Sequence, residues 1–327
     1  MKFDVAAVRG QFPILSAIID GKPVHYLDNG ASAQKPQVVL DTMMKAYSED
    51  YANVHRGLHF LSNASTDAFE QARESVRRFL NAPSKEQIIF TRNATEAINL
   101  VSQSFGGQRI GEGDEIIIPT PYWVSYSDQA LLNDATPILM PTREDEGYAV
   151  RPAELERLIT PKTKAILVNS PCNPTGATYD RSTLEQIAAV AIRHDLIVIS
   201  DEIYEKVLYD GATHLSIASL GAEIAARTVI INGVSKAYAM TGWRIGYAAG
   251  PKELITAMAN IQSQSTSNPC SIAQKAAVAA LTGPQSCVRE MVAEFNRRRK
   301  HVLGQLDKIK SVSYIKPNGA FYVFPDF

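Results

Sequence analysis

The chain has 327 residues, of which 45% are apolar and 20% charged, and its formal net charge is −1. The length and composition suit an enzyme with one large core and a smaller domain. The near-zero net charge does not favour nucleic acid or an anionic membrane surface as a partner. No apolar run approaches the ~18 residues of a membrane span, and the charged N-terminus is unlike a signal peptide. Three scattered cysteines predict neither a disulfide framework nor a zinc site, so we expect a cytoplasmic protein without a metal.

The N-terminal part predicts mainly helices, at 2–9, 37–50 and 65–81. A strand and a small-residue turn are expected at 24–36, and residues 53–66 form a predicted loop. In the third helix, Ser65 is suited to cap the N-terminus. The apolar stripe of this helix consists of Phe69, Ala72, Val76, Phe79 and Leu80.

Residues 87–105 predict a strand, a turn and a helix, with Thr95 at the helix N-terminus. Free N–H groups and the helix dipole make such a position a site for an anion. A plain helix cap is an equally good interpretation, because the strand–turn–helix pattern is common.

Three segments of the front third, residues 1–117, resemble the class V pyridoxal-phosphate (PLP) enzymes, which include the cysteine desulfurases and selenocysteine lyases. They are YLDNGASAQKP, NVHRGLHFLS and FTRNATEAINLV. The resemblance implies that Ala94 and Thr95 cradle the PLP phosphate, and that His55 and Arg56 lie at the active-site rim or a dimer interface. For His55 and His59, ordinary loop histidines are the alternative.

Apolar strands alternate with helical stretches through the rest of the chain, which predicts an α/β fold with a mostly parallel seven-stranded sheet. The expected strands lie near 88–91, 116–119, 137–140, 165–169, 196–200, 228–232 and 245–249. Asp201 follows a fully apolar strand, and Tyr204 comes three residues later. An acid at the carboxyl end of a buried parallel strand lies where doubly wound sheets bind ligands.

Lys236 and Arg244 lie between two strand-like runs, with glycines around them. A lysine between buried strands is partly desolvated, which lowers its pKa and frees a nucleophilic amine. The arginine is a fixed cation with a geometry suited to phosphate. A surface lysine with a structural arginine is the alternative interpretation of such a pair on its own.

From about Pro119 to the end, the chain resembles class I aminotransferases of the aspartate aminotransferase type, most specifically in SKAYAMTGWRIGY. The resemblance implies PLP fold type I, with Lys236 holding PLP as an aldimine and Arg244 holding its phosphate. It further implies Asp201 at the pyridine nitrogen, Asn173 and Tyr204 at the 3′-oxygen, and Trp123 stacked on the ring. Asn173–Pro174 is a candidate cis bond, and Cys172 is expected to be a buried small residue.

We therefore predict an aminotransferase that exchanges an amino group between an amino acid and a 2-oxo acid. The alternatives are a cysteine desulfurase, which would need a loop cysteine, and a PLP-binding protein with little catalysis. The PLP-binding large domain is expected at 50–285, and a small domain at 1–49 and 286–327. Class I enzymes bind the substrate carboxylate with an arginine beyond the strand matching GAFYVFPDF, so we expect an incomplete small domain and weak substrate affinity. A homodimer is expected, with Thr266 or Ser267 reaching the neighbour.

Overall fold

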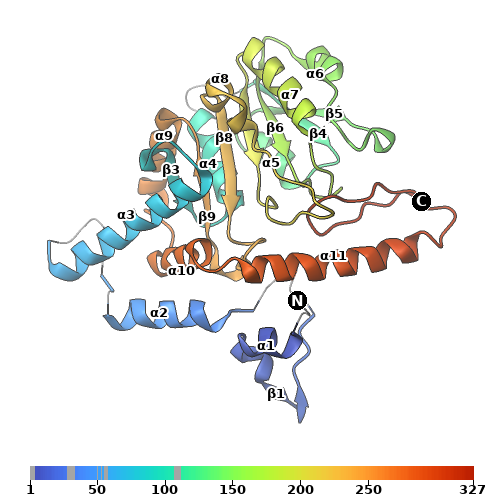
Figure 1. Ribbon diagram of the computed structural model, residues 1–327. Coiled ribbons are helices and arrows are strands. Elements are labelled where there is room, and N and C mark those ends of the chain that lie inside the picture. Colours follow the sequence, from blue (N-terminus) through green and yellow to red (C-terminus); the bar gives the residue numbers. More distant parts are fainter. Residues whose placement is uncertain (1–3, 28–33, 50, 53, 55–57, 107–111) are drawn as a thin grey trace.

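The computed structural model describes residues 4–27, 34–49, 51–52, 54, 58–106 and 112–327. Their core is a seven-stranded sheet of order β3-β9-β8-β7-β6-β4-β5, with helices on both faces (Figure 1). The strands are β3 (Ile88–Thr91), β4 (Glu115–Thr120), β5 (Thr136–Pro141), β6 (Thr163–Asn169), β7 (Ile197–Asp201), β8 (Thr228–Gly233) and β9 (Gly246–Ala249). The α/β fold and the seven predicted strands are confirmed, each to within a few residues.

Five adjacent strands, from β8 to β5, run parallel, and only β9 is antiparallel to its neighbours β8 and β3. Every residue of β7 and β8 is buried. Parallel strands covered on both faces need near-continuous apolar runs. This is why these strands could be located from apolar runs alone.

The helices cover the two faces in separate groups. On one face, α4 (Ala94–Gly106), α5 (Ser125–Leu131) and α9 (Lys252–Ser265) pack against alternate strand residues such as Ile116 and Ile118. On the other face, α3 (Phe60–Leu80) and α10 (Ser271–Thr282) pack at the β3–β9–β8 end, and α6 (Pro152–Leu158) and α7 (Arg181–Arg193) at the far end. Because strand side chains alternate, both faces are apolar and one sheet holds two cores.

The helix α3 begins earlier than its sequence predicts. It starts at Phe60, and the Nδ1 atom of His59 caps it by accepting from the backbone N–H of Ser62 at 3.3 Å. Ser65 is therefore an interior, buried residue, and both the predicted cap at Ser65 and the loop up to residue 66 are wrong. Histidine is an uncommon N-cap residue, so the sequence gives no strong indication that a helix begins at Phe60. The apolar stripe is confirmed: Ala72 and Val76 are buried in the core of this face.

The two ends of the chain also differ from the predicted elements. The N-terminal residues form α1 (Val5–Gly10), a turn at Pro13–Ser16 and a hairpin of β1 (Ile18–Ile19) and β2 (Lys22–Pro23), whereas residues 24–27 form no strand. The helix α11 ends at Leu306, and the segment after it makes only single bridges, at Gly319 and Asp326. The predicted last strand is wrong, because the backbone of this segment bonds to loops, at Gly176 and Val207, rather than to a described strand.

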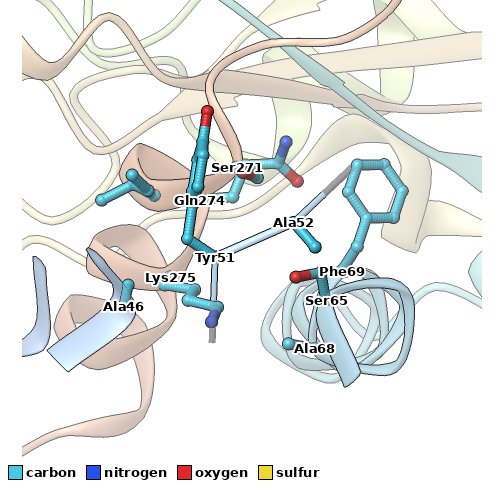
Figure 2. Close-up of a pocket in the computed structure, with 10 residues that line it drawn as sticks. Ala46, Tyr51, Ala52, Ser65, Ala68, Phe69, Ser271, Gln274 and Lys275 are labelled. Atoms are coloured by element: carbon cyan, nitrogen blue, oxygen red, sulfur yellow. The ribbon is translucent and has the colours of Figure 1, made fainter. Parts of the chain in front are cut away.

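The helix α2 (Gln37–Glu49) lies below the body and packs on α10 (Figure 1). Between α2, α3 and α10 is a cavity of about 10 Å³, lined by residues that include Tyr51, Ser65 and Gln274 (Figure 2). That volume suits about one water molecule, so these helices pack closely. In the described part of the chain, no helix combines the length and apolar character of a membrane span.

One glycine sets the distance between the sheet and the start of α4. A Cβ on Gly246, in β9, would lie 2.5 Å from the carbonyl carbon of Asn93 and 2.6 Å from the nitrogen of Ala94. Both are backbone atoms, which cannot rotate away. Glycine here allows the N-terminus of α4 to touch β9.

We predict that Gly246→Ala lowers the free energy of unfolding by roughly 2–3 kcal/mol, because it forces two backbones apart. The matched control is Gly304→Ala in α11, where a Cβ meets nothing within 4 Å. Alanine there should stabilise by about 0.5–1 kcal/mol. Urea unfolding of both variants checks this, and equal midpoints would contradict it.

Candidate active site

Asp201 ends β7 and is buried, with 4% of its surface exposed. Its Oδ2 accepts a hydrogen bond from the hydroxyl of Tyr126 at 2.7 Å, and its Oδ1 accepts from the backbone N–H of Ile203 at 3.1 Å. No ion pair joins this carboxylate to a cation anywhere in the described ranges. Burial raises the pKa of Asp201 to about 6, and the hydrogen bond from Tyr126 opposes the rise. The group is thus a buried acid that lacks a cationic partner.

Lys236 lies in the turn after β8, the strand next to β7. Its Nζ is 5.9 Å from the ring centre of Tyr204 and 5.7 Å from that of Phe321. Burial lowers the pKa of Lys236, as does the nearby charge of Arg244, whereas Asp201 opposes the fall. A partly desolvated amine therefore faces aromatic rings beside a buried acid.

Arg244 is at the end of the same loop, just before β9. Its backbone is in the left-handed region, with φ of 55°, and its Nη1 donates to the carbonyl oxygen of Thr241 at 2.7 Å. The side chain is exposed, so the guanidinium keeps donors for a ligand. Its charge acts on Lys236, which places the two predicted cations in one region.

Tyr204 is the third residue after Asp201, and it is 2% exposed. Its hydroxyl shares a 2.6 Å hydrogen bond with that of Tyr322, from the C-terminal segment. With Ile203, Ala320 and Phe321, the two tyrosines form a small cluster against which Ala94 of α4 also packs. The start of α4, the loop after β7 and the C-terminal segment therefore meet here.

Asn173 lies after β6, and its backbone N–H donates to the Oδ1 of Asn169 at 2.8 Å. The amide of Asn169 in turn donates to the carbonyl oxygen of Asp201 at 3.0 Å, which ties the two loops together. The Asn173–Pro174 bond is cis, as predicted. The neighbouring Cys172 is half-buried rather than fully buried as predicted, and desolvation raises the pKa of its thiol, which makes it a poor nucleophile.

Trp123 lies two residues before α5, and its ring is edge-on to that of Tyr126, with the ring centres 5.4 Å apart. Sequence reasoning missed Tyr126, which is the third residue after Trp123 and lies in the first turn of α5. Tyr126 is thus the link between the predicted stacking residue and the predicted acid.

Ala94 and Thr95 begin α4, as predicted for Thr95. The side-chain oxygen of Asn93 caps the helix by accepting from the backbone N–H of Glu96 at 2.7 Å. The backbone oxygen of Thr95 accepts from the side chain of Gln129, on α5, at 3.4 Å. This helix start is therefore held beside the helix that carries Tyr126.

Some predicted residues fall elsewhere. His55 and Arg56 lie outside the described residues, and His59 caps α3. The hydroxyl of Thr266 is buried inside its own chain, where no hydrogen bond reaches it among the described residues. Ser267 is exposed with φ of 62°. Of these two, only Ser267 offers its side chain to a neighbour.

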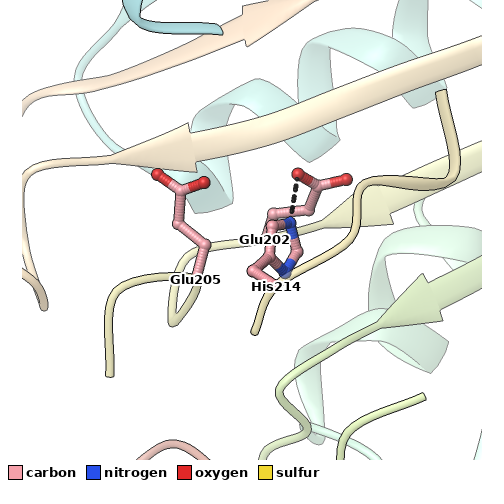
Figure 3. A group of neighbouring side chains, drawn as sticks. All are labelled: Glu202, Glu205 and His214. Atoms are coloured by element: carbon pink, nitrogen blue, oxygen red, sulfur yellow. Dashed lines mark hydrogen bonds and ion pairs between the residues drawn. The ribbon is translucent and has the colours of Figure 1, made fainter. Parts of the chain in front are cut away.

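A second polar cluster, which begins at the residue after Asp201, consists of Glu202, Glu205 and His214 (Figure 3). The Oε1 of Glu202 accepts from the hydroxyls of Ser200 and Ser216, at 2.9 and 2.7 Å. Its Oε2 lies 2.9 Å from the Nε2 of His214. Both oxygens of Glu202 are thus engaged by side chains, and these hydrogen bonds fix the loop after β7.

The chain resembles known proteins over most of its length. The family described as aminotransferase class I and II matches residues 26–327. An aspartate aminotransferase of Geobacillus stearothermophilus is 42% identical over 295 residues, covering 89% of this chain and 72% of that protein. This chain belongs to the class I and II aminotransferases. It is an enzyme of the class I aminotransferase type.

Two further relatives support the same family. An aspartate/prephenate aminotransferase of Cereibacter sphaeroides is 50% identical over 218 residues, or 66% of this chain and 54% of that protein. The crystal structure of the aspartate aminotransferase from Rhizobium meliloti matches with a TM-score of 0.81 and 37% identity, covering 98% of this chain and 76% of that one. The class V resemblance of residues 1–117 stays a prediction, and the family match includes most of that segment.

The raised pKa of Asp201 predicts a pH-dependent stability for this aminotransferase without cofactor. The folded state holds the proton up to about pH 6 and the unfolded chain only to about 3.8, so this group destabilises the fold as pH rises between them. We predict that Asp201→Asn gains roughly 2 kcal/mol relative to wild type between pH 4.5 and 7.5. Urea unfolding at both pH values measures it. The exposed Asp128→Asn variant should show a constant difference, and a constant difference for Asp201→Asn would contradict the assignment.

Proposed function

We propose that this enzyme uses PLP to move an amino group between an amino acid and a 2-oxo acid. The observation that carries the proposal is the meeting of two groups at one sheet edge: Lys236, with its lowered pKa, and Asp201, a buried carboxylate without a cationic partner in the described ranges. Perturbed groups of this kind gather at functional sites.

The side chains present fit PLP. The buried Asp201 would bind the protonated pyridine nitrogen, which is the cation that this carboxylate lacks. The amine of Lys236 would hold the cofactor covalently. The start of α4 and Arg244 would bind the phosphate, since a helix N-terminus and a guanidinium both favour an anion. The contact of Gly246 with that helix start supports a backbone cradle at Ala94 and Thr95.

The remaining predicted residues would surround the ring. Tyr204 and Asn173 would donate to its 3′-oxygen, and Trp123 would cover one face. Tyr126 supports this arrangement, because its hydroxyl donates to one oxygen of Asp201 and so fixes the orientation of the carboxylate. It also lowers the pKa of Asp201, so that the carboxylate is ionised at neutral pH.

PLP, when bound, supplies a protonated ring that accepts the electron pair left as the Cα–H bond of the amino acid breaks. Lys236 would take the proton from Cα through Nζ, and burial and the charge of Arg244 both lower its pKa, which favours the neutral amine that a base needs. Asp201 would keep the ring nitrogen protonated. The aromatic rings of Tyr204 and Phe321 exclude water around Nζ.

Aspartate is the proposed amino-acid substrate, with a 2-oxo acid as amino-group acceptor, because relatives from several bacteria carry the name aspartate aminotransferase. Sulfide release from cysteine would instead favour the desulfurase alternative, for which the shielded thiol of Cys172 gives no support. Failure to form glutamate from 2-oxoglutarate and aspartate, despite PLP uptake, would favour a binding protein with little catalysis.

We predict that Lys236→Ala lowers turnover of aspartate and 2-oxoglutarate by about 10³-fold or more, since it removes the acid–base group. Borohydride reduction of the PLP-treated wild type should add the mass of the cofactor to the peptide that contains Lys236. The exposed Lys252→Ala variant is the control and should retain both properties. A reduced adduct on another lysine would refute the assignment.

We also propose a homodimer in the cytoplasm, with the large domain at 50–285 and the small domain at 1–49 and 286–327. Large apolar side chains are exposed on α2 and at the start of α3, including Met44, Tyr47 and Phe60, of which Phe60 is 82% exposed. We propose that these exposed apolar side chains form part of the dimer interface, where burial against a second copy would remove them from water.

Light scattering should give twice the mass of the 35.8 kDa chain. Phe60→Glu should shift the protein towards monomer, because it places a charge in the apolar interface. A monomeric wild type with full PLP affinity would contradict the dimer.

A further inference from the structure

The hydroxyl groups of Tyr204 and Tyr322 lie 2.6 Å apart, and their rings are nearly perpendicular, at 81° with centres 5.7 Å apart. In the described part of the chain, neither hydroxyl has another hydrogen-bond partner. The pair therefore forms a closed unit within the protein.

The two tyrosines hold two hydroxyl protons, one more than the hydrogen bond between them uses. Burial raises the pKa of Tyr204 and of Tyr322, so both hydroxyls keep their protons at neutral pH. One O–H bond is used between the two oxygens, and the other proton is left over. A buried donor without an acceptor is costly, so this proton is available to a ligand that brings an acceptor.

Of the two tyrosines, Tyr204 is the one whose contacts with Lys236 and Asp201 are described. The ring of Tyr204 lies 5.9 Å from Nζ of Lys236, and its hydroxyl is electrostatically coupled to the carboxylate of Asp201. The hydroxyl of Tyr322 contacts that of Tyr204. The order from the C-terminal segment to the candidate site is thus Tyr322, then Tyr204, then Lys236.

Tyr322 is held firmly enough for such a role. The backbone N–H groups of Asn318 and Gly319 both donate to the carbonyl oxygen of Gly176 at 3.0 Å, and that of Ala320 donates to Val207 at 2.9 Å. The hydroxyl of Tyr209 donates to the carbonyl oxygen of Ala320. Backbone bonds to two loops of the sheet therefore fix the segment just before Tyr322.

We propose that Tyr322 is a positioning residue, whose hydroxyl donates to Tyr204 so that Tyr204 donates its own proton to an anionic oxygen on the cofactor ring. This inference rests on the proposed function, in which that oxygen belongs to PLP. Donation from Tyr322 strengthens the second bond, because hydrogen bonds in a chain polarise one another. It also removes the rotational freedom of the Tyr204 hydroxyl.

The test uses the full-length protein loaded with PLP and compares Tyr322→Phe, Tyr204→Phe and the double variant. Phenylalanine keeps the ring packing and removes only the hydroxyl. Tyr314→Phe is the matched control. Tyr314 lies in the same C-terminal segment, but its hydroxyl donates to the carbonyl oxygen of Leu303 in α11. The readouts are the Kd for PLP and the pH midpoint of the visible absorbance of the bound cofactor.

Tyr322→Phe should raise the Kd for PLP about three- to tenfold, the loss of roughly one hydrogen bond. The pH midpoint should rise, because a ring oxygen with a weaker donor holds its proton more tightly. Tyr204→Phe should do more, and adding Tyr322→Phe to it should change little. The control should match wild type.

The outcomes separate the two proposals. If wild type takes up PLP but Tyr322→Phe leaves both readouts unchanged, the relay is wrong and the proposed function stands. If the effect of Tyr322→Phe persists in full when Tyr204 is already phenylalanine, the relay is equally wrong, because the two hydroxyls then act independently. If wild type takes up no PLP, both proposals fall.

Discussion

The buried carboxylate of Asp201 is the interaction on which the site depends. A carboxylate removed from water is costly unless it is neutralised or hydrogen-bonded, and this one has a hydroxyl and a backbone N–H but no cation among the described residues. Burial raises the pKa of this carboxyl to about 6, and a cationic ring beside it would favour the ionised form. The free-energy cost of burying this carboxylate would thus be offset when a cationic ring binds beside it.

The sheet supplies the rest of the arrangement through topology. Because β6, β7 and β8 run parallel and in register, Asn169, Asp201 and the turn of Lys236 appear at the same edge, although they are far apart in sequence. Doubly wound sheets bind ligands at this edge. The loops after these strands then tie themselves together by side-chain hydrogen bonds, and the C-terminal segment covers them.

Residues whose role depends on chemistry and strand position could be predicted from the sequence. Apolar runs located all seven strands. The motif around Lys236 identified the amine, and the position of Asp201 at the end of an apolar strand identified the acid now found near it. Residues that act through side-chain contacts between distant segments could not be predicted. Tyr126 and Tyr322 have no local pattern that indicates a hydroxyl partner in another loop. The start of α3 was missed because His59 replaces the usual capping residues, and the last strand because strand-like composition does not supply a free sheet edge.

The strand order has a consequence for how the enzyme is made. Among the described residues, the strand β3 lies at the edge of the sheet and pairs only with β9, the last of the described strands. Domains form during synthesis from the N-terminus onward, and contacts between distant residues are slow to close. The start of α4 can therefore reach β9 and the loop of Lys236 only after the whole sheet sequence has left the ribosome. Until then, β3 has no neighbouring strand on either side, and a nascent chain stalled before β9 would expose both of its edges to other chains.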